Sequence, residues 1–283
     1  MTGGRRCARV ICPAKVNRFL AVGPPDRRGY HPLRTLFQTI TLADTLVLTE
    51  TTGTTELFIE GAEIPAENTL TKTLRLVREL IDLPPMRIHL IKQIPAESGL
   101  GGGSSDAAGL LRGLNALGYP LPWDQAESVA AAVGADVPFF LVGGLARGEG
   151  YGERLTALPD PIRESLVVVR PSIGISTPAA YRELDAAPAR PWADFPPDHA
   201  LTPFNDFELV APLACRELLD WLRAHGATAA LLCGSGSAVF GVFESPQAAA
   251  HGADRARAAH LGEVWTAETL GRDAALAVEL SPA

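Results

Sequence analysis

The chain lacks several features that would assign it to common classes of protein. It contains no uninterrupted apolar run of the roughly 18 residues that a membrane-spanning helix requires, so we expect no membrane span. The arginines near the N-terminus are not followed by a long apolar segment, so we expect no signal peptide. The formal net charge of −7 provides no general attraction to nucleic acid or to an anionic membrane. Any anionic ligand must therefore be held by local donors.

Cysteine is scarce, and its few occurrences are scattered along the chain. Their spacing matches no metal-binding motif. We expect free, mostly buried thiols in a cytoplasmic protein rather than disulfides or a metal site. The four cysteines are Cys7, Cys12, Cys215 and Cys233.

Lysine is much rarer than arginine. Of 25 basic residues, only Lys15, Lys72 and Lys92 are lysines. Lys15 and Lys92 stand beside the segments that carry the chemical signals described below. Because an ammonium is a compact point charge and a guanidinium is a planar fork, arginine differs there in both size and geometry. We therefore treat Lys15 and Lys92 as candidate site residues.

The most informative segment is the glycine-rich stretch 95–108, with the sequence PAESGLGGGSSDAA. An extended run, Ile88–Ile91, precedes it, and an apolar periodic run begins at Leu110, so a loop leads from a strand into a helix. Glycines let the backbone approach a ligand closely, and Ser104–Asp106 is a natural helix start with unpaired N–H groups. This combination predicts an anion site, for which phosphate is the natural ligand.

Two common nucleotide-binding loops do not fit this stretch. A P-loop needs Gly-Lys-Ser/Thr at the helix start, and no glycine in the chain is followed by lysine. The dinucleotide fingerprint would use Gly99 and Gly101, but Ser104 stands where its last glycine belongs. A nicotinamide-dependent oxidoreductase is therefore a remote alternative. A plain tight turn also remains open, although three successive glycines cost more backbone entropy than such a turn requires.

Strand-like and helix-like segments occur in mixed clusters rather than in strict alternation. The predicted strands are rich in Val, Ile, Leu, Thr and Phe and span 9–12, 16–22, 33–41, 44–49, 57–60, 88–91, 166–169 and 264–268. The predicted helices have apolar residues three or four apart and span 68–81, 104–117, 123–133, 209–225 and 248–261. The stretch 185–203, rich in Pro, Ala and Asp, is predicted to be a surface excursion. The pattern favours an α+β fold with two lobes, residues 1–160 and 161–283.

Two short segments place a charged residue in apolar surroundings. In Pro13–Asn17, Lys15 follows an apolar strand, and such a lysine can reach a cleft and stabilise developing negative charge. In Gly134–Pro138, Asp136 lies between a helix-ending glycine and an apolar run, where burial disfavours ionisation unless a cation lies close. Lys15 is the natural candidate for that cation. The alternatives are a solvated edge lysine and a turn aspartate.

Two further segments carry weaker signals. In Gly29–Leu33, Tyr30 offers a ring for stacking and His31 offers directional hydrogen bonds, although an ordinary turn is an equal alternative. The small residues of Gly234–Ser237 follow an apolar strand. They form either a second wall of a phosphate pocket or a bend without a ligand.

Taken together, the segments 13–17, 95–108 and 234–240 resemble those of the GHMP kinase superfamily, which is named for galactokinase, homoserine kinase, mevalonate kinase and phosphomevalonate kinase. The resemblance spans essentially the whole chain. It implies a ribosomal-protein-S5-like N-terminal lobe and a ferredoxin-like C-terminal lobe, with the active site in the cleft between them. It also implies a kinase of a small-molecule alcohol, with ATP as co-substrate and Mg²⁺ bound to the ATP.

Within the superfamily, the segments 13–17, 29–38, 101–106 and 134–138 resemble the branch that acts on a cytidine-diphosphate-linked methylerythritol in the non-mevalonate route to isoprenoids. That branch transfers the γ-phosphate of ATP to the 2-hydroxyl. The alternatives are mevalonate-, homoserine- or galactose-type kinases and an inactive nucleotide-binding relative. The Gly29–His31 element suits a flat heteroaromatic ring better than a small polar acid, and the intact Lys15 and Asp136 argue against an inactive relative.

The resemblance also implies roles for individual residues. Asp136 would be the general base, and Lys15 would keep it ionised and stabilise charge on the moving phosphoryl group. Asn17 would help place the methylerythritol. The cytosine ring would lie between Tyr30 and Tyr181, with His31 bonded to its edge. The resemblance implies a monomer or a weak homodimer, without nucleic-acid or membrane partners.

The ATP site implied by the resemblance is larger. The residues near the nucleoside end would be Asn68 and Lys92, and those around the phosphates would be Pro95, Ala96, Glu97, Ser98, Gly99, Leu100, Gly101, Gly102, Gly103, Ser104 and Ser105. Glu97 departs from the family, which usually has a small neutral residue there. Because a carboxylate that faces triphosphate repels it, we expect the Glu97 side chain to point outward.

Overall fold

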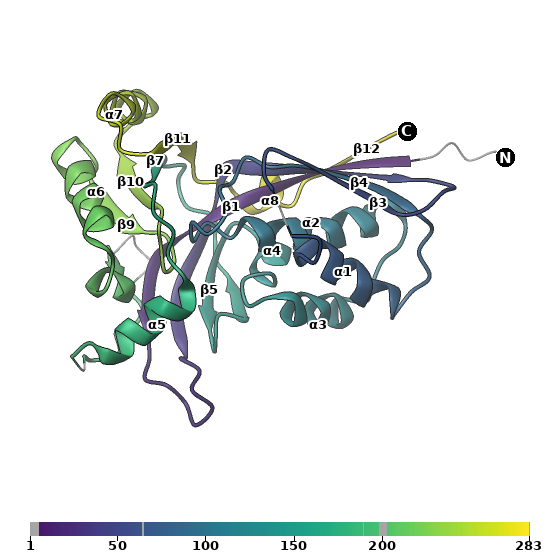
Figure 1. Ribbon diagram of the computed structural model, residues 1–283, viewed down its shortest axis with the longest axis horizontal. Helices are drawn as coiled ribbons and strands as arrows, with labels where there is room; N and C mark the ends of the chain where they lie inside the picture. The colour runs from purple at the N-terminus through teal and green to yellow at the C-terminus, as the bar shows by residue number, and fades with distance from the viewer. Residues whose placement is uncertain (1–5, 64, 189, 198–202, 283) are drawn as a thin grey trace.

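The computed structural model describes residues 6–63, 65–188, 190–197 and 203–282 and contains a large and a small β-sheet. The large sheet has eight strands: β1 (Arg6–Val22), β2 (Leu33–Glu50), β3 (Glu56–Glu60), β4 (Met86–Ile91), β5 (Leu145–Glu149), β6 (Arg154–Ala157), β8 (Phe204–Asn205) and β12 (Val278–Pro282). The small sheet has the order β11 (Glu263–Glu268), β7 (Ser165–Arg170), β10 (Val239–Phe243), β9 (Ala229–Leu232). Figure 1 shows two lobes, with the long strands β1 and β2 running between them. The predicted two-lobed α+β fold is confirmed.

The strands β1 and β2 are each longer than the sequence pattern predicts. We expected a break at Pro13, but β1 continues through it, with a register shift between Pro13 and Ala14. Ala14 pairs with Ile40 and Pro13 pairs with Ala43. Thr41 and Leu42 of β2 lie between these two pairs and form the bulge. The prediction of two shorter strands in each region was wrong, because a bulge accommodates the missing N–H of a proline without ending the strand.

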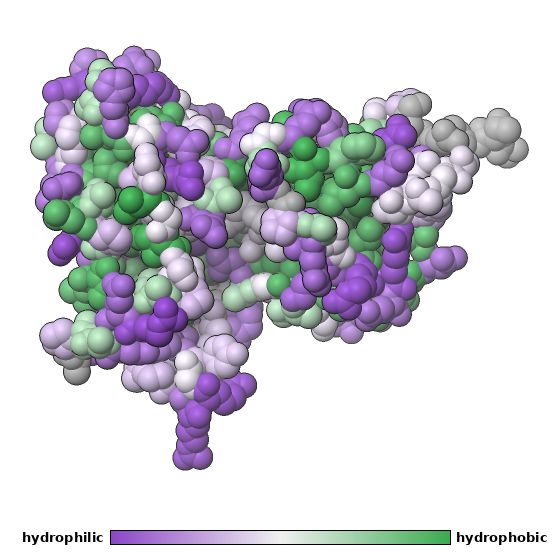
Figure 2. All heavy atoms as spheres, in the orientation of Figure 1, coloured by the Kyte–Doolittle hydropathy of each residue, from purple (hydrophilic) through white to green (hydrophobic). Residues whose placement is uncertain are grey.

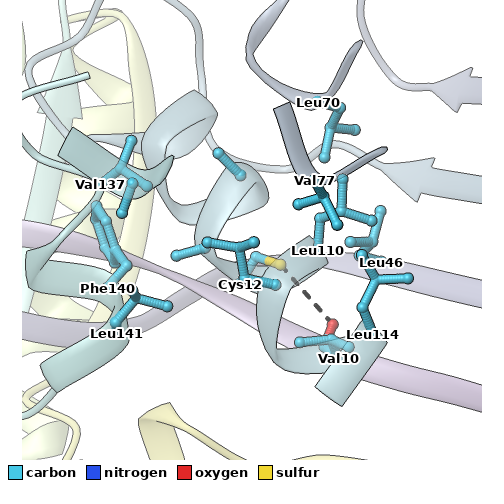
Figure 3. Close-up of a cluster of buried hydrophobic side chains, with 14 of the residues drawn as sticks. Val10, Cys12, Leu46, Leu70, Val77, Leu110, Leu114, Val137, Phe140 and Leu141 are labelled. Atoms are coloured by element: carbon cyan, nitrogen blue, oxygen red, sulfur yellow. Dashed lines mark hydrogen bonds between the residues drawn. The ribbon is translucent and has the colours of Figure 1, made fainter. Parts of the chain in front are cut away.

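The N-terminal lobe places its helices on one face of the large sheet (Figure 1). These helices are α1 (Thr69–Arg78), α2 (Gly102–Leu117), α3 (Trp123–Val133) and the short α4 (Phe139–Val142). Figure 3 shows the resulting core, in which Leu110 and Leu114 of α2 lie near Cys12 and Leu46 of the sheet. Helix α2 approaches β1 very closely, since a Cβ at Gly109 would lie 2.4 Å from Cys12 Sγ. Helix α2, which begins within the glycine stretch, is thereby packed against the sheet.

The helices of the C-terminal lobe are α5 (Thr177–Ala186), the 3₁₀ helix η2 (Asp206–Leu209), α6 (Leu213–Ala224) and α7 (Pro246–Ala258), while α8 (Arg272–Ala275) precedes β12. Two of these helices, α6 and α7, pack on the small sheet, and α5 and η2 lie beside it. Strand β12 returns to pair antiparallel with β1, so Pro282 lies opposite Arg6 (Figure 1). A division of the chain at residue 160 stays a proposal, with the qualification that β8 and β12 join the large sheet.

The five predicted helices differ from the structure mainly at their ends, whereas α4, α5 and α8 were not predicted. Helix α3 matches its predicted range. The predicted helix 209–225 begins only at Leu213, because Pro212 is its N-cap residue and η2 ends before it. The predicted excursion 185–203 overlaps the end of α5, and its residues 189 and 198–202 lie outside the described residues. Within the ranges described above, no helix is long and apolar enough to cross a membrane.

The hairpin between β1 and β2 projects from the body of the molecule. Its tip, residues 23–32, is at the bottom of Figure 1, and the same projection is strongly hydrophilic in Figure 2. The tip carries Tyr30 and His31. Two predicted site residues are therefore presented on a protruding turn rather than in the sheet.

Candidate active site

A cavity of about 560 Å³ lies where the glycine stretch meets the C-terminal lobe. Residues from both lobes line it, including Lys15, Asn17, Asn68, Lys92, Pro95–Gly99, Gly101–Ser104, Asp136, Tyr181 and Ser235. Of the predicted site residues, Leu100 and Ser105 are fully buried and, like Tyr30 and His31, are not part of this lining. The cavity thus brings together the candidate lysine, the candidate aspartate and most of the glycine stretch.

The start of α2 forms one wall of this cavity. The first backbone bond of the helix joins Ser105 N to Gly101 O at 2.9 Å. The N–H groups of Gly102, Gly103 and Ser104 therefore have no partner within the helix, and all three residues line the cavity. The predicted start at Ser104–Asp106 was wrong by two residues, because Gly101 takes a left-handed conformation (φ 76°) and is the N-cap. The unpaired N–H groups and the helix dipole make this wall an anion-binding surface.

The two glycine loops touch each other across the lobes. Gly99 has a φ of 76°, and a Cβ at this position would lie 1.9 Å from the carbonyl oxygen of Cys233. The N–H of Ala238 donates to Ser98 O at 3.1 Å. The segment 233–238 is therefore packed directly against the phosphate loop. Only glycine allows this approach, because any side chain at position 99 would overlap the opposite backbone.

Lys15 and Asp136 form an ion pair inside the cavity. Lys15 Nζ lies 3.4 Å from Asp136 Oδ2, and the side chain of Lys15 is only 4% exposed, against 34% for Asp136. The backbone N–H of Lys15 donates to Leu100 O at 2.9 Å, which connects β1 to the glycine stretch. The structure thus brings the two residues together, as the sequence analysis expected. A carboxylate at this position can accept a proton from a hydroxyl group in the cavity.

Asn17 is a second partner of the Lys15 ammonium, besides Asp136. Its Oδ1 accepts a hydrogen bond from Lys15 Nζ at 2.9 Å and another from Gly234 N at 3.0 Å. Its Nδ2 donates to Thr35 Oγ1 at 2.8 Å. The predicted role of Asn17 in placing the methylerythritol stays a prediction, since most of its hydrogen-bonding capacity is used within the protein.

Lys92 lies between two buried carboxylates below the start of α2. Its Nζ donates to Asp106 Oδ2 at 2.8 Å and also to Asp44 Oδ2. Asp44 additionally accepts the backbone N–H of Ile94 at 2.8 Å. Burial and the neighbouring Asp44 raise the pKa of Asp106 to about 7, although Lys92 acts in the opposite direction. This cluster fixes the end of β4 against α2, and the predicted contact of Lys92 with the nucleoside end of ATP remains untested.

The replacement Asp106→Asn should change how stability depends on pH. In the unfolded chain the Asp106 carboxyl loses its proton near its ordinary pKa of 3.8, whereas in the folded chain it does so near 7. Between these values the unfolded state binds fewer protons, so raising the pH from about 4 to about 7 favours unfolding of the wild type. Thermal unfolding measured without nucleotide should show the Tm of the variant rising relative to wild type across this range. A constant difference would contradict the raised pKa.

Asn68 and Glu97 both line the cavity, but their side chains have different neighbours. The Oδ1 of Asn68 caps α1 by accepting the N–H of Leu70 at 2.9 Å, and its Nδ2 donates to Pro65 O at 2.9 Å. Glu97 is exposed, and its Oε2 lies 3.4 Å from the position that a Cβ of Gly174 would occupy. The Glu97 carboxylate therefore faces the segment that follows β7 in the C-terminal lobe.

The aromatic residues predicted to hold cytosine are not arranged as a sandwich in this structure. The Tyr181 ring stacks on His31, with a centroid distance of 5.1 Å, while Tyr30 packs edge-on against Tyr151 at 5.8 Å. Tyr30 is 62% exposed. A sandwich between Tyr30 and Tyr181 stays a prediction and would require the Tyr30 ring to leave Tyr151.

Both ring nitrogens of His31 nevertheless have polar partners. Its Nδ1 lies 2.9 Å from Gly23 O, and its Nε2 lies 3.2 Å from Asp185 Oδ1 of the C-terminal lobe. Behind the stacked pair, Phe207 packs edge-on against Tyr181 at 4.9 Å. The hairpin tip is thus connected to α5 and η2, and the pair forms an aromatic boundary near the Tyr181 side of the cavity.

Cys233 adjoins the site but is no candidate nucleophile. Its side chain is fully buried, and burial raises the pKa of the thiol to about 12. A protonated thiol is a poor nucleophile and a poor metal ligand. All four cysteines are free.

One segment that packs behind the site was missed by sequence reasoning, namely Asn205–Glu208. The side chains of Asn205, Asp206 and Glu208 bond to the backbone of β9 and β1, and Phe207 supports Tyr181. The only local signal was a cluster of polar residues beside the surface excursion, which is also typical of a loop. Its role depends on contacts with residues far away in the sequence.

Two family models match this chain. Residues 68–144 match the GHMP kinases N terminal domain, and residues 209–261 match the GHMP kinases C terminal. The first match includes α1, the glycine stretch and Asp136, and the second includes α6, the Gly234 loop and α7.

Curated relatives match over most of the chain. A 4-diphosphocytidyl-2-C-methyl-D-erythritol kinase of Moorella thermoacetica is 38% identical over 261 residues, which cover 85% of this chain and 92% of the relative. The enzyme of the same name from Thermus thermophilus is 38% identical over 283 residues, which cover 93% of this chain and 97% of the relative.

Solved structures agree with these matches. A crystal structure of 4-(cytidine 5'-diphospho)-2C-methyl-D-erythritol kinase superimposes with a TM-score of 0.80 at 36% identity and covers 93% of this chain and 99% of that chain. A homoserine kinase from Cytophaga hutchinsonii superimposes with a TM-score of 0.69 at 16% identity over 99% and 98% of the two chains. The second likeness supports the fold alone.

Proposed function

The chain belongs to the 4-diphosphocytidyl-2-C-methyl-D-erythritol kinases of the GHMP kinase family, and from this premise we propose how its residues carry out the reaction. It is an ATP-dependent small-molecule kinase. It phosphorylates 4-diphosphocytidyl-2-C-methyl-D-erythritol in isoprenoid biosynthesis, and the acceptor is the 2-hydroxyl. The observation that best supports this mechanism is the Lys15–Asp136 ion pair, which shares a cavity with the unpaired N–H groups of α2.

Asp136 acts as the general base for the acceptor hydroxyl. It is the carboxylate that lies 3.4 Å from the buried ammonium of Lys15, and its partial exposure leaves it accessible from the cavity. Lys15 pairs with this carboxylate before transfer and stabilises negative charge on the phosphoryl group during transfer. Because phosphoryl transfer depends chiefly on positioning and electrostatics, this pair supplies the chemical part of the site.

The phosphate loop holds the donor. The N–H groups of Gly102, Gly103 and Ser104 lie at the positive end of the α2 dipole, where phosphate oxygens are stabilised. Residues 95–99 and 101 also line the cavity, and we expect the lining residues Asn68 and Lys92 to lie toward the nucleoside. Glu97 faces Gly174, so its charge is directed toward the C-terminal lobe.

Magnesium fits this site as an ion that arrives with ATP. Among the described residues, no three His, Cys, Asp or Glu side chains form a cluster that could hold a metal by themselves. Mg²⁺ usually binds through one or two protein oxygens plus the substrate phosphates. Ser104, which lines the cavity at the start of α2, carries a hydroxyl oxygen of the right kind. When bound, the ion would neutralise charge on the phosphates.

The cytidine end of the acceptor binds at the aromatic side of the cavity. Tyr181 lines the cavity and stacks on His31, which lies at the base of the hairpin tip. A pyrimidine ring has a flat face for Tyr181 and Tyr30 and polar edge atoms for His31. This arrangement favours a cytidine-linked substrate over mevalonate or homoserine, which have no ring.

The replacement His31→Ala should weaken binding of the cytidine substrate far more than it slows transfer. Loss of the ring removes both the stack under Tyr181 and the edge bond to the base, so we expect the acceptor KM to rise about 10-fold or more. The kcat and the KM for ATP should change by less than about threefold, because His31 lies outside the donor site. Steady-state kinetics with each substrate varied would test this. An unchanged acceptor KM would remove the argument for a cytosine pocket.

The function itself is tested by a coupled ADP-release assay. The purified protein should release ADP with 4-diphosphocytidyl-2-C-methyl-D-erythritol and ATP, and at background rates with mevalonate, homoserine or galactose. Comparable turnover of one of those three would favour the corresponding alternative kinase. Absence of turnover with all four, together with retained ATP binding, would favour an inactive nucleotide-binding relative.

The proposed setting of the enzyme follows from its chemistry. Its free cysteines and its need for ATP support the cytoplasm as its compartment. We also propose a monomer or a weak homodimer as the active form.

A further inference from the structure

The side chain of Asn205 is buried beneath the Gly234 loop. It lies on β8, next to Leu20 of β1, and is 5% exposed. Its Nδ2 donates to Leu232 O at 2.9 Å and to Gly234 O at 2.8 Å, while its Oδ1 accepts the N–H of Phe207 at 3.0 Å. Both amide hydrogens and the oxygen are therefore in use. Asn205 is not part of the cavity lining, so any effect on the reaction must act through its neighbours.

The Gly234 backbone links Asn205 to the catalytic lysine. Its carbonyl is held by Asn205, and its N–H donates to Asn17 Oδ1 at 3.0 Å. The same Asn17 oxygen accepts Lys15 Nζ at 2.9 Å. Gly234 has a φ of 55°, and a Cβ there would lie 3.3 Å from Lys15 Nζ. A shift of the Gly234 backbone would therefore change the surroundings of the ammonium directly.

We propose that Asn205 is a positioning residue for phosphoryl transfer, which fixes the Gly234 backbone so that Asn17 holds Lys15 toward Asp136. The inference rests on the proposed function, because it concerns the Lys15–Asp136 pair. Lys15 is a flexible side chain with three donors, and the pair needs one of them aimed at a carboxylate 3.4 Å away. A misplacement of about 1 Å in an active site can lower the rate about 100-fold.

Glu208 provides a matched control in the same segment. Its Oε1 accepts the N–H of Leu232 at 3.0 Å, so it also supports β9 by a hydrogen bond. No hydrogen bond within the described part of the chain joins the Glu208 side chain to Gly234 or Asn17. Loss of either side chain weakens support of β9, but only loss of Asn205 releases the Gly234 carbonyl.

The experiment compares kinetics of Asn205→Ala, Asn205→Asp and Glu208→Ala with thermal unfolding of each. Asn205→Ala should lower kcat about 10- to 100-fold, while the KM values for ATP and for the acceptor change less than about threefold. Asn205→Asp keeps the volume and the acceptor but turns a carboxylate oxygen toward two carbonyl oxygens, so its kcat should fall at least as far. Glu208→Ala should keep kcat within about threefold of the wild-type value, even if its Tm falls as far as that of Asn205→Ala.

A double replacement tests whether Asn205 acts through Asn17. If both residues serve the same Lys15 geometry, Asn17→Ala combined with Asn205→Ala should lower kcat much less than the product of the two single effects. A product of the full single effects, a normal kcat in both Asn205 variants, or equal losses of kcat in Asn205→Ala and Glu208→Ala would each overturn the proposal. If Asn205→Ala fails to fold, the same comparison is made with Asn205→Asp. Failure of the wild type to turn over the cytidine substrate would instead refute the proposed function.

Discussion

The replacement Asp136→Asn is expected to abolish phosphoryl transfer, with kcat lower by about 10³-fold or more. The amide keeps the shape of the side chain but can neither accept the hydroxyl proton nor neutralise Lys15, whose ammonium lies 3.4 Å away in the wild type. ATP affinity should remain nearly unchanged. Asp136 lies in the turn after α3, whereas the donor is held by backbone N–H groups at the start of α2.

The measurement combines ADP release under saturating substrates with direct titration of ATP binding. Asp124→Asn is a suitable control, since Asp124 is an exposed carboxylate in the first turn of α3 and does not line the cavity. We expect wild-type turnover from the control. Near-normal turnover by Asp136→Asn would exclude Asp136 as the base, and a large loss of ATP affinity would mean that the donor and acceptor sites are not separable as proposed.

The replacement Gly99→Ala should damage both stability and ATP binding. A methyl group at position 99 would lie 1.9 Å from the Cys233 carbonyl oxygen, and the residue would also have to keep a φ of 76°. Left-handed backbone costs a residue with a side chain about 1–2 kcal/mol, and the overlap with backbone forces the two loops apart. We expect a Tm lower by on the order of 5–10 °C and a KM for ATP about 10-fold higher or more.

Gly103 offers a control within the same stretch. It is helical, and the nearest atom to a Cβ at that position, Thr69 Oγ1, would lie at an ordinary 3.4 Å. Because alanine favours a helix over glycine, Gly103→Ala should leave the Tm unchanged or raise it slightly. Differential scanning fluorimetry of the two variants would decide the matter. A Gly99→Ala protein as stable as Gly103→Ala would show that the two loops can separate without cost.

Much of the fold could be predicted because its signals are local. Helix α3 was predicted to the residue, since the spacing of apolar residues and a following glycine depend only on near neighbours. Strand β1 was predicted in two pieces, because the bulge at Pro13 depends on the partner strand β2. The strands β5, β6, β8, β10 and β12 were not predicted. They are short or exposed, and pairing with distant strands stabilises them rather than their own composition.

The candidate site could likewise be predicted only where its signals are local. The composition and order of its segments predicted an anion site at the start of α2. They also predicted a lysine and an aspartate of opposite charge. Lys92 was predicted to meet nucleotide, yet the structure places its ammonium between Asp44 and Asp106. Asn205 belongs to a polar cluster beside the surface excursion, a pattern that is equally typical of a loop. Its partners, Leu232 and Gly234, are reached only when β8 lies beside β1 and β9.

By itself, the sequence determined that this protein has a glycine-rich phosphate loop at a helix start and a lysine and an aspartate in apolar surroundings. These features follow from backbone freedom, side-chain charge and short-range periodicity, which are properties of neighbouring residues. Only the tertiary structure decided that Lys15 and Asp136 form a pair, that Gly99 meets the backbone of the other lobe, and that Asn205 holds the Gly234 loop. These contacts join residues far apart along the chain, and strand pairing between the lobes, rather than local preference, sets their distances.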